Sequence, residues 1–572
     1  MSRPGFRSLD VLALVVLLCA ALPVGAVPHV GAVPSVGGGS ALAGVQGPAA
    51  TDSAAMAAPG SEAAIVAVSP NPVADGDRGE FVVLDLPAEG AYHLDDGEGR
   101  VALPNVTGRV AVTAAPALVR NLSDTRVVGV AGMPALANGG ERLRLLRDDE
   151  TVATARYRDA PEGELGRFDE RGAVTWRAVG RTDRPVVTGS GGSATAFVLP
   201  DAPDVAVETI RDADERVLLA GYTFSSRRVA RALERAAARG VRVRVLLEGE
   251  PVDGLSRREA HLLDSLVAAG VSVELVGGPP DRYAYHHAKY AVVDDRALVL
   301  TENWKPAGTG GRASRGWGVR TADPDVVAGL ATTFRADANW TGVRGWREFR
   351  RGRSFTTRSV ANGSYPTRHD PATVAVERTS LVVAPDNAER AVIDLLDDAT
   401  ESIDVVQLNV DEPDGEFLRT TVRAARRGVE VRVLLSSAWY VREENRRIVE
   451  RLRERAESED LPIRAKLAAP EGRFEKIHAK GVVVDGDRVL VGSLNWNRES
   501  ARENREVMLL LEGETVAGYY RGVFESDWAA ASGDDPRSLP VGSILAVAGI
   551  VVLAVLVARR VEFGETTGVG PG

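Results

Sequence analysis

The chain of 572 residues is long enough for several hydrophobic cores, and its hydrophobic share of 44% excludes a chain that is disordered throughout. The formal net charge of −10 argues against a broad basic surface for nucleic acid but is compatible with a local cationic groove. The single cysteine, Cys19, excludes an intramolecular disulfide and a metal site built from thiolates.

Residues 1–26 have the layout of a secretory signal peptide. A basic start precedes an apolar run over residues 11–22, and small residues follow it. An uncleaved membrane anchor is the alternative, although the run is short for a span of about 20 residues. Residues 27–62 are rich in Ala, Gly, Pro and Val with almost no charge, which predicts a low-complexity, flexible linker.

Residues 63–175 contain short β runs separated by turn residues, a pattern that predicts an all-β sandwich. Three stretches, at residues 70–72, 79–84 and 138–141, resemble the lamin-tail family, an immunoglobulin-like module often attached to exported hydrolases. No catalytic constellation occurs in this region. The resemblance implies a role in binding or positioning, and a simple spacer is equally compatible with it.

The rest of the chain alternates strands and helices and contains an internal duplication. The run at residues 239–247 (RGVRVRVLL) aligns with the run at 427–435 (RGVEVRVLL), and in each run the glycine, Gly240 or Gly428, follows a predicted helix. We therefore expect two α/β units, 185–341 and 378–531, joined by an irregular linker at 342–377.

The C-terminal region predicts a membrane span. Residues 539–558 are apolar and uncharged, and at about 1.5 Å per residue they would cross a hydrocarbon core of about 30 Å. Arg559 and Arg560 follow directly, which predicts a cytoplasmic tail at 559–572 and a catalytic region outside the cell. A buried helix of a soluble domain is the alternative.

A histidine-lysine-aspartate pattern, H-x-K-x4-D, occurs once in each α/β unit. With seven histidines and five lysines in the whole chain, two such pairs by chance are improbable. Each copy is followed by a hydroxyl residue and an asparagine. The two sets are His287, Lys289, Asp294, Thr301 and Asn303, and His478, Lys480, Asp485, Ser493 and Asn495.

This spacing predicts an anion-binding site that works without metal. Alternate residues of an extended segment point to the same side, so each copy delivers an imidazole and an ammonium to one place. Two facing copies would supply a nucleophile, a proton donor and two cations. Cleavage of a phosphodiester needs such a set of groups.

The doubled motif resembles the phospholipase D superfamily, the HKD phosphodiesterases. The resemblance implies that one histidine attacks phosphorus to form a phosphohistidine, while the other protonates the leaving alcohol and then activates water or an acceptor alcohol. By this analogy His287 is the nucleophile and His478 the general acid and base, and the reverse order stays open. No cofactor and no metal are implied.

The resemblance also implies roles for the neighbours of the histidines. Asp294 and Asp485 would position the histidines or lysines, and Glu506 would orient a motif histidine through a hydrogen bond. In the first unit Gly318 occupies the place of Glu506, which fits unequal histidine roles or a weakened first unit. The residues expected to hold the phosphoryl oxygens or the substrate are Lys289, Lys480, Asn303, Asn495, Thr301 and Ser493.

The predicted fold class is therefore α/β: two phospholipase D-like α/β/α units with pseudo-twofold symmetry, preceded by an immunoglobulin-like β-sandwich and followed by one transmembrane helix. The predicted function is an exported, membrane-anchored phosphodiesterase that cleaves nucleic acid. One alternative is a phospholipase D or a cardiolipin-synthase-like phosphatidyltransferase. A second alternative is a non-catalytic surface binding module.

Overall fold

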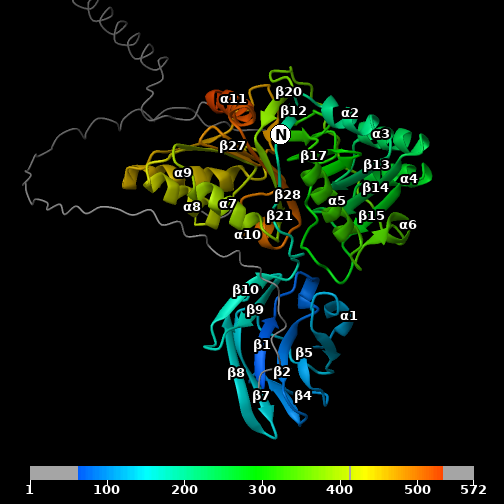
Figure 1. Ribbon diagram of the computed structural model, residues 1–572, viewed down its shortest axis with the longest axis vertical. Helices are drawn as coiled ribbons and strands as arrows, with labels where there is room; N and C mark the ends of the chain where they lie inside the picture. Colours follow the sequence, from blue (N-terminus) through cyan, green and yellow to red (C-terminus); the bar gives the residue numbers. More distant parts are fainter. Residues whose placement is uncertain (1–61, 411–413, 532–572) are drawn as a thin grey trace, which may run out of the picture. The chain divides into compact units, whose positions relative to one another are not determined.

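The computed structural model describes residues 62–410 and 414–531, and Figure 1 colours them along the chain. The predicted transmembrane helix is corrected by the structure. Within these described ranges no helix is both long and apolar enough to cross a membrane. The stretch 539–558 itself, the predicted signal peptide and nearly all of the predicted linker 27–62 lie outside the described residues.

The first described region is a sandwich of two β-sheets. Leu94, Leu143 and Leu145 of one sheet share a core with Val82 and Leu84 of the other. The six-stranded sheet, in spatial order, is β10 (Val174–Ala178), β9 (Glu164–Phe168), β1 (Ala64–Ser69), β2 (Phe81–Leu86), β5 (Gly108–Thr113) and β6 (Arg126–Gly129). The four-stranded sheet is β4 (Arg100–Ala102), β3 (Tyr92–Asp95), β7 (Gly140–Arg147) and β8 (Glu150–Arg158), and the short helices are η1 (Asp75–Asp77) and α1 (Pro116–Val119).

The first α/β unit is built on a mixed sheet. Its strands along the chain are β12 (Gly192–Leu199), β13 (Arg216–Gly221), β14 (Arg242–Glu248), β15 (Ser272–Val276), β16 (Tyr290–Val293), β17 (Arg296–Leu300), β18 (Ser314–Thr321), β19 (Arg344–Gly345) and β20 (Ala372–Val376). Its helices are α2 (Asp204–Arg211), α3 (Arg227–Ala238), α4 (Arg257–Ala268), α5 (Pro324–Ala338) and α6 (Trp346–Phe349). The spatial order is β19-β15-β14-β13-β16-β17-β18-β12-β20.

The second unit repeats this plan. Its strands are β11 (Val187–Gly189), β21 (Arg378–Ala384), β22 (Ser402–Gln407), β23 (Glu430–Leu435), β24 (Ile463–Leu467), β25 (Lys476–Ile477), β26 (Gly481–Val484), β27 (Arg488–Gly492) and β28 (Glu506–Glu512). Its helices are α7 (Ala388–Asp397), α8 (Glu416–Arg426), α9 (Arg442–Glu459), α10 (Arg498–Arg502) and α11 (Glu514–Ala530). The sheet runs β11-β21-β28-β27-β26-β22-β23-β24, so the predicted duplication of an α/β unit is confirmed.

Local sequence explains why the repeated helices form. Helix α3 begins after Ser226, whose side chain accepts a hydrogen bond from the backbone N–H of Val229. Its buried residues recur at helical spacing, and Figure 1 shows α2, α3 and α4 beside β13, β14 and β15. The helix ends before Gly240, which has a φ of +92°, and α8 ends before Gly428 at +99°, a conformation that favours glycine.

The two units exchange strands and share their central core. Strand β11 precedes the first unit in the sequence but pairs with β21 of the second, and β25 of the second unit pairs with β18 of the first. The predicted linker 342–377 is partly regular, because it contains β19, α6 and β20, and β20 pairs with β12. Apolar residues of α5 and α11 pack between the two sheets in one core.

Candidate active site

Each motif histidine lies just before a central strand and is anchored to the opposite unit. The backbone N–H of His287, before β16, donates to the carbonyl oxygen of Arg505 at 2.9 Å. The backbone N–H of His478, before β26, donates to the carbonyl oxygen of Arg315 at 2.8 Å. These two equivalent hydrogen bonds relate the units by a pseudo-twofold arrangement and bring both motifs to their boundary.

His287 is paired with a buried carboxylate. Its Nδ1 lies 2.8 Å from Oε1 of Glu506, the first residue of β28. Burial opposes ionisation of Glu506, but His287, Lys289 and Ser493 outweigh it and hold the Glu506 pKa below its usual value. Because an ionised carboxylate only accepts hydrogen bonds, the ring proton of His287 lies on Nδ1 and its Nε2 carries a lone pair. Burial lowers the pKa of His287 to about 4, so the ring is neutral near pH 7.

His478 has different neighbours. Its Nδ1 lies 3.3 Å from Nζ of Lys480 and 3.4 Å from Oε2 of Glu302. An ammonium only donates hydrogen bonds, so in the neutral ring Nδ1 accepts and Nε2 carries the proton. Burial, followed by the charge of Lys480 and other lysines, holds the pKa of His478 well below its usual value. The two motif histidines therefore hold opposite tautomers.

The two motif lysines are buried and act on both histidines. The charge of Lys480 lowers the pKa of His287, and the charge of Lys289 lowers that of His478, so the two motifs form one electrostatic site. Burial lowers the pKa of Lys480 to about 8, against the opposing effect of Glu302, and burial also lowers that of Lys289 strongly. Each ammonium donates to the carbonyl oxygen of its own motif histidine.

The motif aspartates lie at the far end of the strands. The Asp294 carboxylate accepts backbone N–H groups of residues 214–216 at 2.8–2.9 Å, and Asp485 accepts those of residues 400–402. Both aspartates have a φ of +53°, which the left-handed turn after the strand requires. The structure thus places their carboxylates on backbone turns, where the sequence prediction had them positioning the histidines or lysines.

The predicted substrate contacts divide into two kinds. The hydroxyl of Thr301 accepts the backbone N–H of Trp317 at 2.9 Å, and that of Ser493 accepts the N–H of Val507 at 3.0 Å, so both hydroxyls hold neighbouring strands. Asn303 and Asn495 each have a buried side-chain oxygen without a hydrogen-bond partner among the described residues. The two asparagines keep the predicted role of substrate contacts.

The sequence prediction missed Glu302. It lies in the segment Thr301-Glu302-Asn303, where the second copy reads Ser493-Leu494-Asn495. A charged residue replacing leucine between two predicted site residues was the available signal.

The position equivalent to Glu506 in the first unit is Gly316, and the prediction of Gly318 was wrong. The equivalent arginines, Arg505 and Arg315, define the correspondence through their hydrogen bonds to the motif histidines, and Glu506 and Gly316 directly follow them.

Tyr222, after β13, is a second residue that the sequence prediction missed. Its ring lies edge-on to the His287 ring with centroids 4.8 Å apart, and Nζ of Lys289 lies 5.4 Å from its centroid. The pairing of Phe224 with Trp304 matches that of Val410 with Trp496, so the equivalent of Tyr222 in the second unit is Leu408. The two sides of the site therefore differ in shape as well as in charge.

A cationic pocket of about 330 Å³ is linked to the site through two of its lysines. Lys305 and Lys476 line it and also act electrostatically on His478 and Glu302. Arg258 and Arg358 add two guanidinium groups to the lining.

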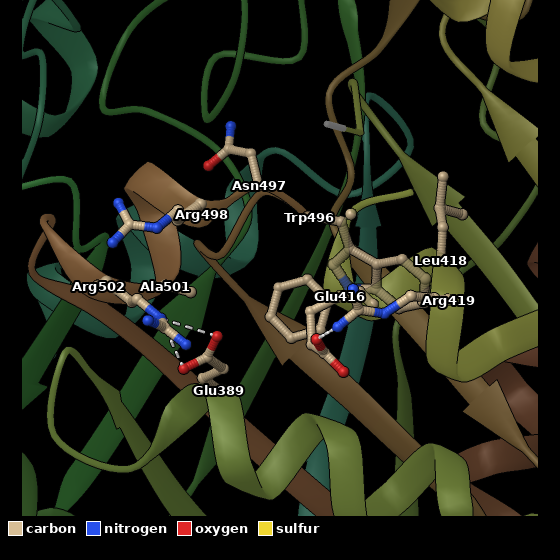
Figure 2. A pocket seen from close by; sticks show the side chains of 11 residues that line it. Glu389, Glu416, Leu418, Arg419, Trp496, Asn497, Arg498, Ala501 and Arg502 are labelled. Carbon is tan, nitrogen blue, oxygen red and sulfur yellow. Dashed lines mark hydrogen bonds and ion pairs between the residues drawn. The ribbon is translucent and has the colours of Figure 1, made fainter. Parts of the chain in front are cut away.

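A separate pocket of about 230 Å³ lies against Trp496 (Figure 2). Figure 2 shows Arg502 paired with Glu389 and Arg419 paired with Glu416, and no motif histidine or lysine lines this pocket.

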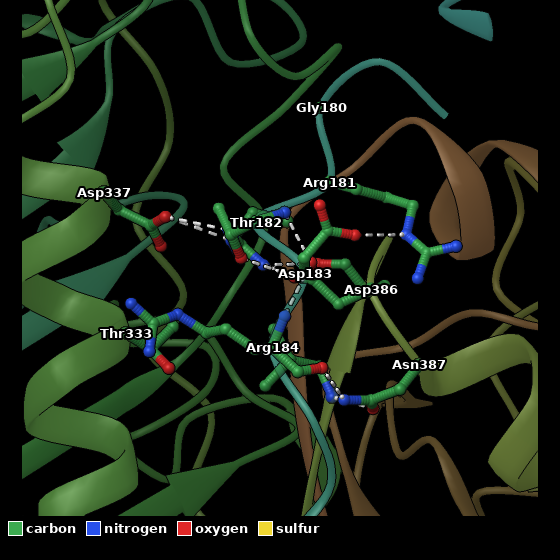
Figure 3. A network of polar contacts seen from close by, with 12 residues as sticks. Gly180, Arg181, Thr182, Asp183, Arg184, Thr333, Asp337, Asp386 and Asn387 are labelled. Atoms are coloured by element: carbon green, nitrogen blue, oxygen red, sulfur yellow. Dashed lines mark hydrogen bonds and ion pairs between the residues drawn. The ribbon is translucent and has the colours of Figure 1, made fainter. Parts of the chain in front are cut away.

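A buried ionic network fixes the strand that anchors His287. The Arg505 guanidinium is fully buried and donates to Asp386 at 2.7 Å and to Asp337 at 3.1 Å. Figure 3 shows Thr182, in the segment before β11, reaching the same Asp386 carboxylate, which it contacts through its hydroxyl at 2.7 Å. Arg315 is the equivalent arginine of the first unit, and its buried partners are Asp201 and Asp527.

Among the residues that the structure describes, no group of three or more His, Cys, Asp or Glu side chains is arranged to hold a metal ion.

Comparisons with known proteins point to one family. A family model described as "Cardiolipin synthase, PLD-like domain" matches residues 206–338 and 392–528. The mitochondrial cardiolipin hydrolase of Xenopus tropicalis is 40% identical over 52 residues, which are 9% of this chain and 25% of that protein. The chain thus spans about a quarter of the curated relative.

Solved structures with a similar chain path include phosphatidylserine synthase from Haemophilus influenzae Rd KW20, with 12% identity and a TM-score of 0.44 over 65% of this chain and 94% of that one. Nuc, a phospholipase D family member from Salmonella typhimurium, has 17% identity and a TM-score of 0.24 over 27% of this chain and 96% of that one. The family model matches from residue 206 onward, so the lamin-tail resemblance of the β-sandwich stays a prediction. Residues 206–338 and 392–528, each with one histidine motif at the shared boundary, are the two copies of a phospholipase D-like domain.

Proposed function

We propose that the protein is a phosphodiesterase that cleaves nucleic acid through a covalent phosphohistidine and without a metal ion. The observation that carries the proposal is a pair of buried histidines whose Nδ1 atoms have opposite partners, a carboxylate for His287 and an ammonium for His478. One ring offers a lone pair on Nε2 and the other offers a proton on Nε2, as the two halves of a nucleophilic displacement require.

The geometry supports a role for each histidine. His287 Nε2 attacks phosphorus, and the P–N bond forms as the bond to the leaving oxygen breaks. His478 gives its Nε2 proton to that oxygen. In the second step a water gives a proton to His478 Nε2 and attacks phosphorus, and the P–N bond breaks. Glu506 keeps the proton of His287 on Nδ1 throughout and stabilises the positive charge of the phosphohistidine.

Lys289 and Lys480 supply the positive charge that stabilises the phosphoryl oxygens. Both are buried beside the histidines, where an ammonium interacts more strongly with an anion than it would in water. The proposal therefore expects full activity in the presence of a chelator.

The cationic pocket supports a substrate with more than one phosphate. Two acidic residues, Glu259 and Glu475, line it beside four basic ones. Glu259 is already occupied, because its carboxylate accepts the N–H of Ser256 at 2.8 Å and that of Phe224 at 3.0 Å. The guanidinium of Arg258 donates its Nε–H to a backbone carbonyl. A phosphate next to the scissile one fits this pocket, and nucleic acid carries such a phosphate at every step.

Exposed aromatic side chains support the choice of a single-stranded nucleic acid. Trp439 is 85% exposed, and its ring contacts that of Tyr440 with centroids 5.6 Å apart. Lys476, which lines the cationic pocket, lies 4.9 Å from the Tyr440 ring centroid. An aromatic surface beside cations is suited to stacking an unpaired base while its phosphate is neutralised.

A phosphatidyltransferase or phospholipase D is the second candidate. The matching family model is described as a cardiolipin synthase domain, and the matching relative is named a cardiolipin hydrolase. Cardiolipin also contains two phosphates, so the same cationic pocket would serve it.

The test incubates the purified full chain with end-labelled single-stranded DNA and, separately, with cardiolipin vesicles, both in excess chelator. Cleavage of DNA with no release of lipid products supports the proposal. Lipid products without DNA cleavage select the second candidate. Binding of either substrate without turnover selects a non-catalytic binding module, and activity that disappears in chelator contradicts the metal-free mechanism. His287→Ala is the control for contaminating activity.

A further inference from the structure

The two units carry their active-site carboxylates at different positions. In the second unit the carboxylate is Glu506, directly after Arg505. At the equivalent position after Arg315 the first unit has Gly316, which has no side chain to offer to His478. Strand equivalence alone would therefore leave one motif histidine without an acidic partner.

The Glu302 side chain fills the place that Gly316 leaves. A Cβ added at Gly316 would lie 2.7 Å from Oε1 and 2.8 Å from Cδ of Glu302, distances too short for real contacts. In the second unit the arrangement is reversed, because Leu494 stands at the position of Glu302 and is buried in the core. The pair Glu302 and Gly316 is thus the mirror of the pair Leu494 and Glu506.

Glu302 faces His478 in a fully buried setting. Its Oε2 lies 3.4 Å from Nδ1 of His478, and neither carboxylate oxygen has a hydrogen-bond partner among the described residues. The charges that act on it most strongly are cationic and come from both units: Lys480, Lys305, Lys476 and Lys289. A buried carboxylate with no hydrogen bond is costly for stability, which argues that it has a function.

We propose that Glu302 is the positioning residue of His478. Its carboxyl group shares a proton with Nδ1 of His478, and this proton keeps the ring neutral when Nε2 gives its own proton to the leaving oxygen. This inference rests on the proposed function. In the first step the Nε2 proton moves to the leaving oxygen and the shared proton settles on Nδ1. In the second step water returns a proton to Nε2, and the Nδ1 proton returns to Glu302.

The charge states of the two carboxylates fit these unequal roles. Burial raises the pKa of Glu302 to about 7, and the nearby lysines offset this only in part. The pKa of Glu506 is instead lowered, because His287 and its other partners outweigh burial. Glu506 is therefore a fixed anion that supports a nucleophile, whereas Glu302 can hold a proton near neutral pH.

The first test compares two leaving groups. Nitrophenolate leaves without protonation, whereas a nucleoside alkoxide needs the proton of His478. Glu302→Gln should lower kcat on single-stranded DNA by about 10²–10⁴-fold with little change in KM, the usual range for general acid catalysis. On bis(p-nitrophenyl) phosphate the first-turnover burst of nitrophenolate, which reports the first step alone, should slow by less than about tenfold. An equal loss on both substrates would show that Glu302 only supports the structure, and the inference would fail.

The second test moves the carboxylate. Glu302→Leu combined with Gly316→Glu recreates in the first unit the arrangement of Leu494 and Glu506. The double variant should be at least about tenfold more active than Glu302→Leu. Gly316→Glu alone should be inactive, because its side chain collides with Glu302. If the folded double variant, checked by its unfolding temperature, is no better than Glu302→Leu, the inference is overturned.

A third readout needs no turnover and so separates this inference from the proposed function. Nitrogen NMR of the imidazole rings follows tautomer and titration directly. Glu302→Gln should change the signals of His478 and leave those of His287 in place, and Glu506→Gln should do the opposite. If the His478 ring is unchanged by Glu302→Gln, the pairing is wrong whatever the protein cleaves. If it changes in a protein that cleaves neither DNA nor lipid, the pairing holds and the proposed function fails.

Discussion

The backbone N–H of His287 donates to the carbonyl oxygen of Arg505, so the proposed nucleophile of the first unit is held by a strand of the second. The reciprocal bond joins His478 to Arg315. Each arginine is in turn paired with a buried aspartate of the opposite unit. The partner of Arg505 is Asp337, and the partner of Arg315 is Asp527. The active site is therefore a property of the boundary, and neither unit contains it alone.

The anchoring network predicts a stability effect. Arg505→Met removes a fully buried cation and leaves the carboxylates of Asp337 and Asp386 without their shared ion-pair partner. We expect unfolding to become easier by about 3–5 kcal/mol, the usual range for breaking a buried ion pair, together with loss of turnover. Urea unfolding measures the change. Arg446→Met, which removes a half-exposed helix pair, is the control and should change stability by less than about 1 kcal/mol. Equal midpoints for the two variants would contradict this account.

The opposite tautomers predict which variant traps the intermediate. With bis(p-nitrophenyl) phosphate, His478→Ala should still form the phosphoenzyme, because this leaving group needs no acid, but hydrolysis should slow by about 10²–10⁴-fold. The adduct should therefore accumulate and be visible by intact-protein mass spectrometry. His287→Ala should form no adduct. Accumulation in His287→Ala and none in His478→Ala would reverse the two roles.

The activity should depend on pH with a weakly acidic optimum, between about pH 4 and about pH 7. The acid limb comes from His287, whose pKa is lowered to about 4 and whose protonation removes the nucleophilic lone pair. On the alkaline side, activity falls as Glu302, with a pKa of about 7, loses the shared proton. It falls further as Lys480, with a pKa of about 8, loses its phosphate-binding charge. A kcat/KM profile on DNA measures both limbs. Glu302→Gln should remove the lower alkaline transition, and a profile unchanged by this variant would exclude Glu302 as its origin.

Stability should show the cost of the buried Glu302. Its folded pKa, about 7, lies above the ordinary value of 4.5, so between these values the folded state binds the proton and the unfolded state does not. This contribution favours folding at low pH and is lost as pH rises toward 7. Above that pH, Glu302→Gln should be more stable than the wild type by on the order of 3 kcal/mol. Unfolding temperatures at pH 5 and pH 8.5 measure this, and a variant that gains nothing at pH 8.5 would refute it.

The cationic pocket should appear in the salt dependence of binding. Arg258→Ala and Arg358→Ala should each weaken binding of single-stranded DNA, and each should reduce the slope of log affinity against log salt by about 0.7 if it contacts one phosphate. Fluorescence anisotropy with catalytically inactive His287→Ala as the background measures both. Arg231→Ala, on the exposed side of α3, is the control and should leave the slope unchanged. Identical slopes for all three variants would show that DNA does not enter the pocket.

The sequence was most informative where the chemistry is local. His-x-Lys on an extended segment is a feature of three adjacent residues, so His287, Lys289 and their repeats could be identified without a structure. The role of Asp294 could not, because its partners are backbone groups at residues 214–216, far away in the chain. Its left-handed φ is likewise invisible in composition.

Long-range correspondence was the other limit. The stretch between Trp304 and Arg315 is longer than that between Trp496 and Arg505, so sequence spacing does not give the correspondence, and the strands place Gly316, not the predicted Gly318, opposite Glu506. The pairing of β20 with β12 was missed for a similar reason, because an Arg-, Ser- and Thr-rich stretch gives no sign of the distant strand that completes it.

The mismatch between Gly316 and Glu506 has a consequence for how such a catalyst can change over time. In an assembly of two identical chains every substitution is made twice, so a glycine that suited one histidine would deprive the other. A single polypeptide that encodes both copies is free of this constraint. Only a chain whose two copies can mutate independently can move the acidic residue to a neighbouring strand in one copy and keep it in place in the other.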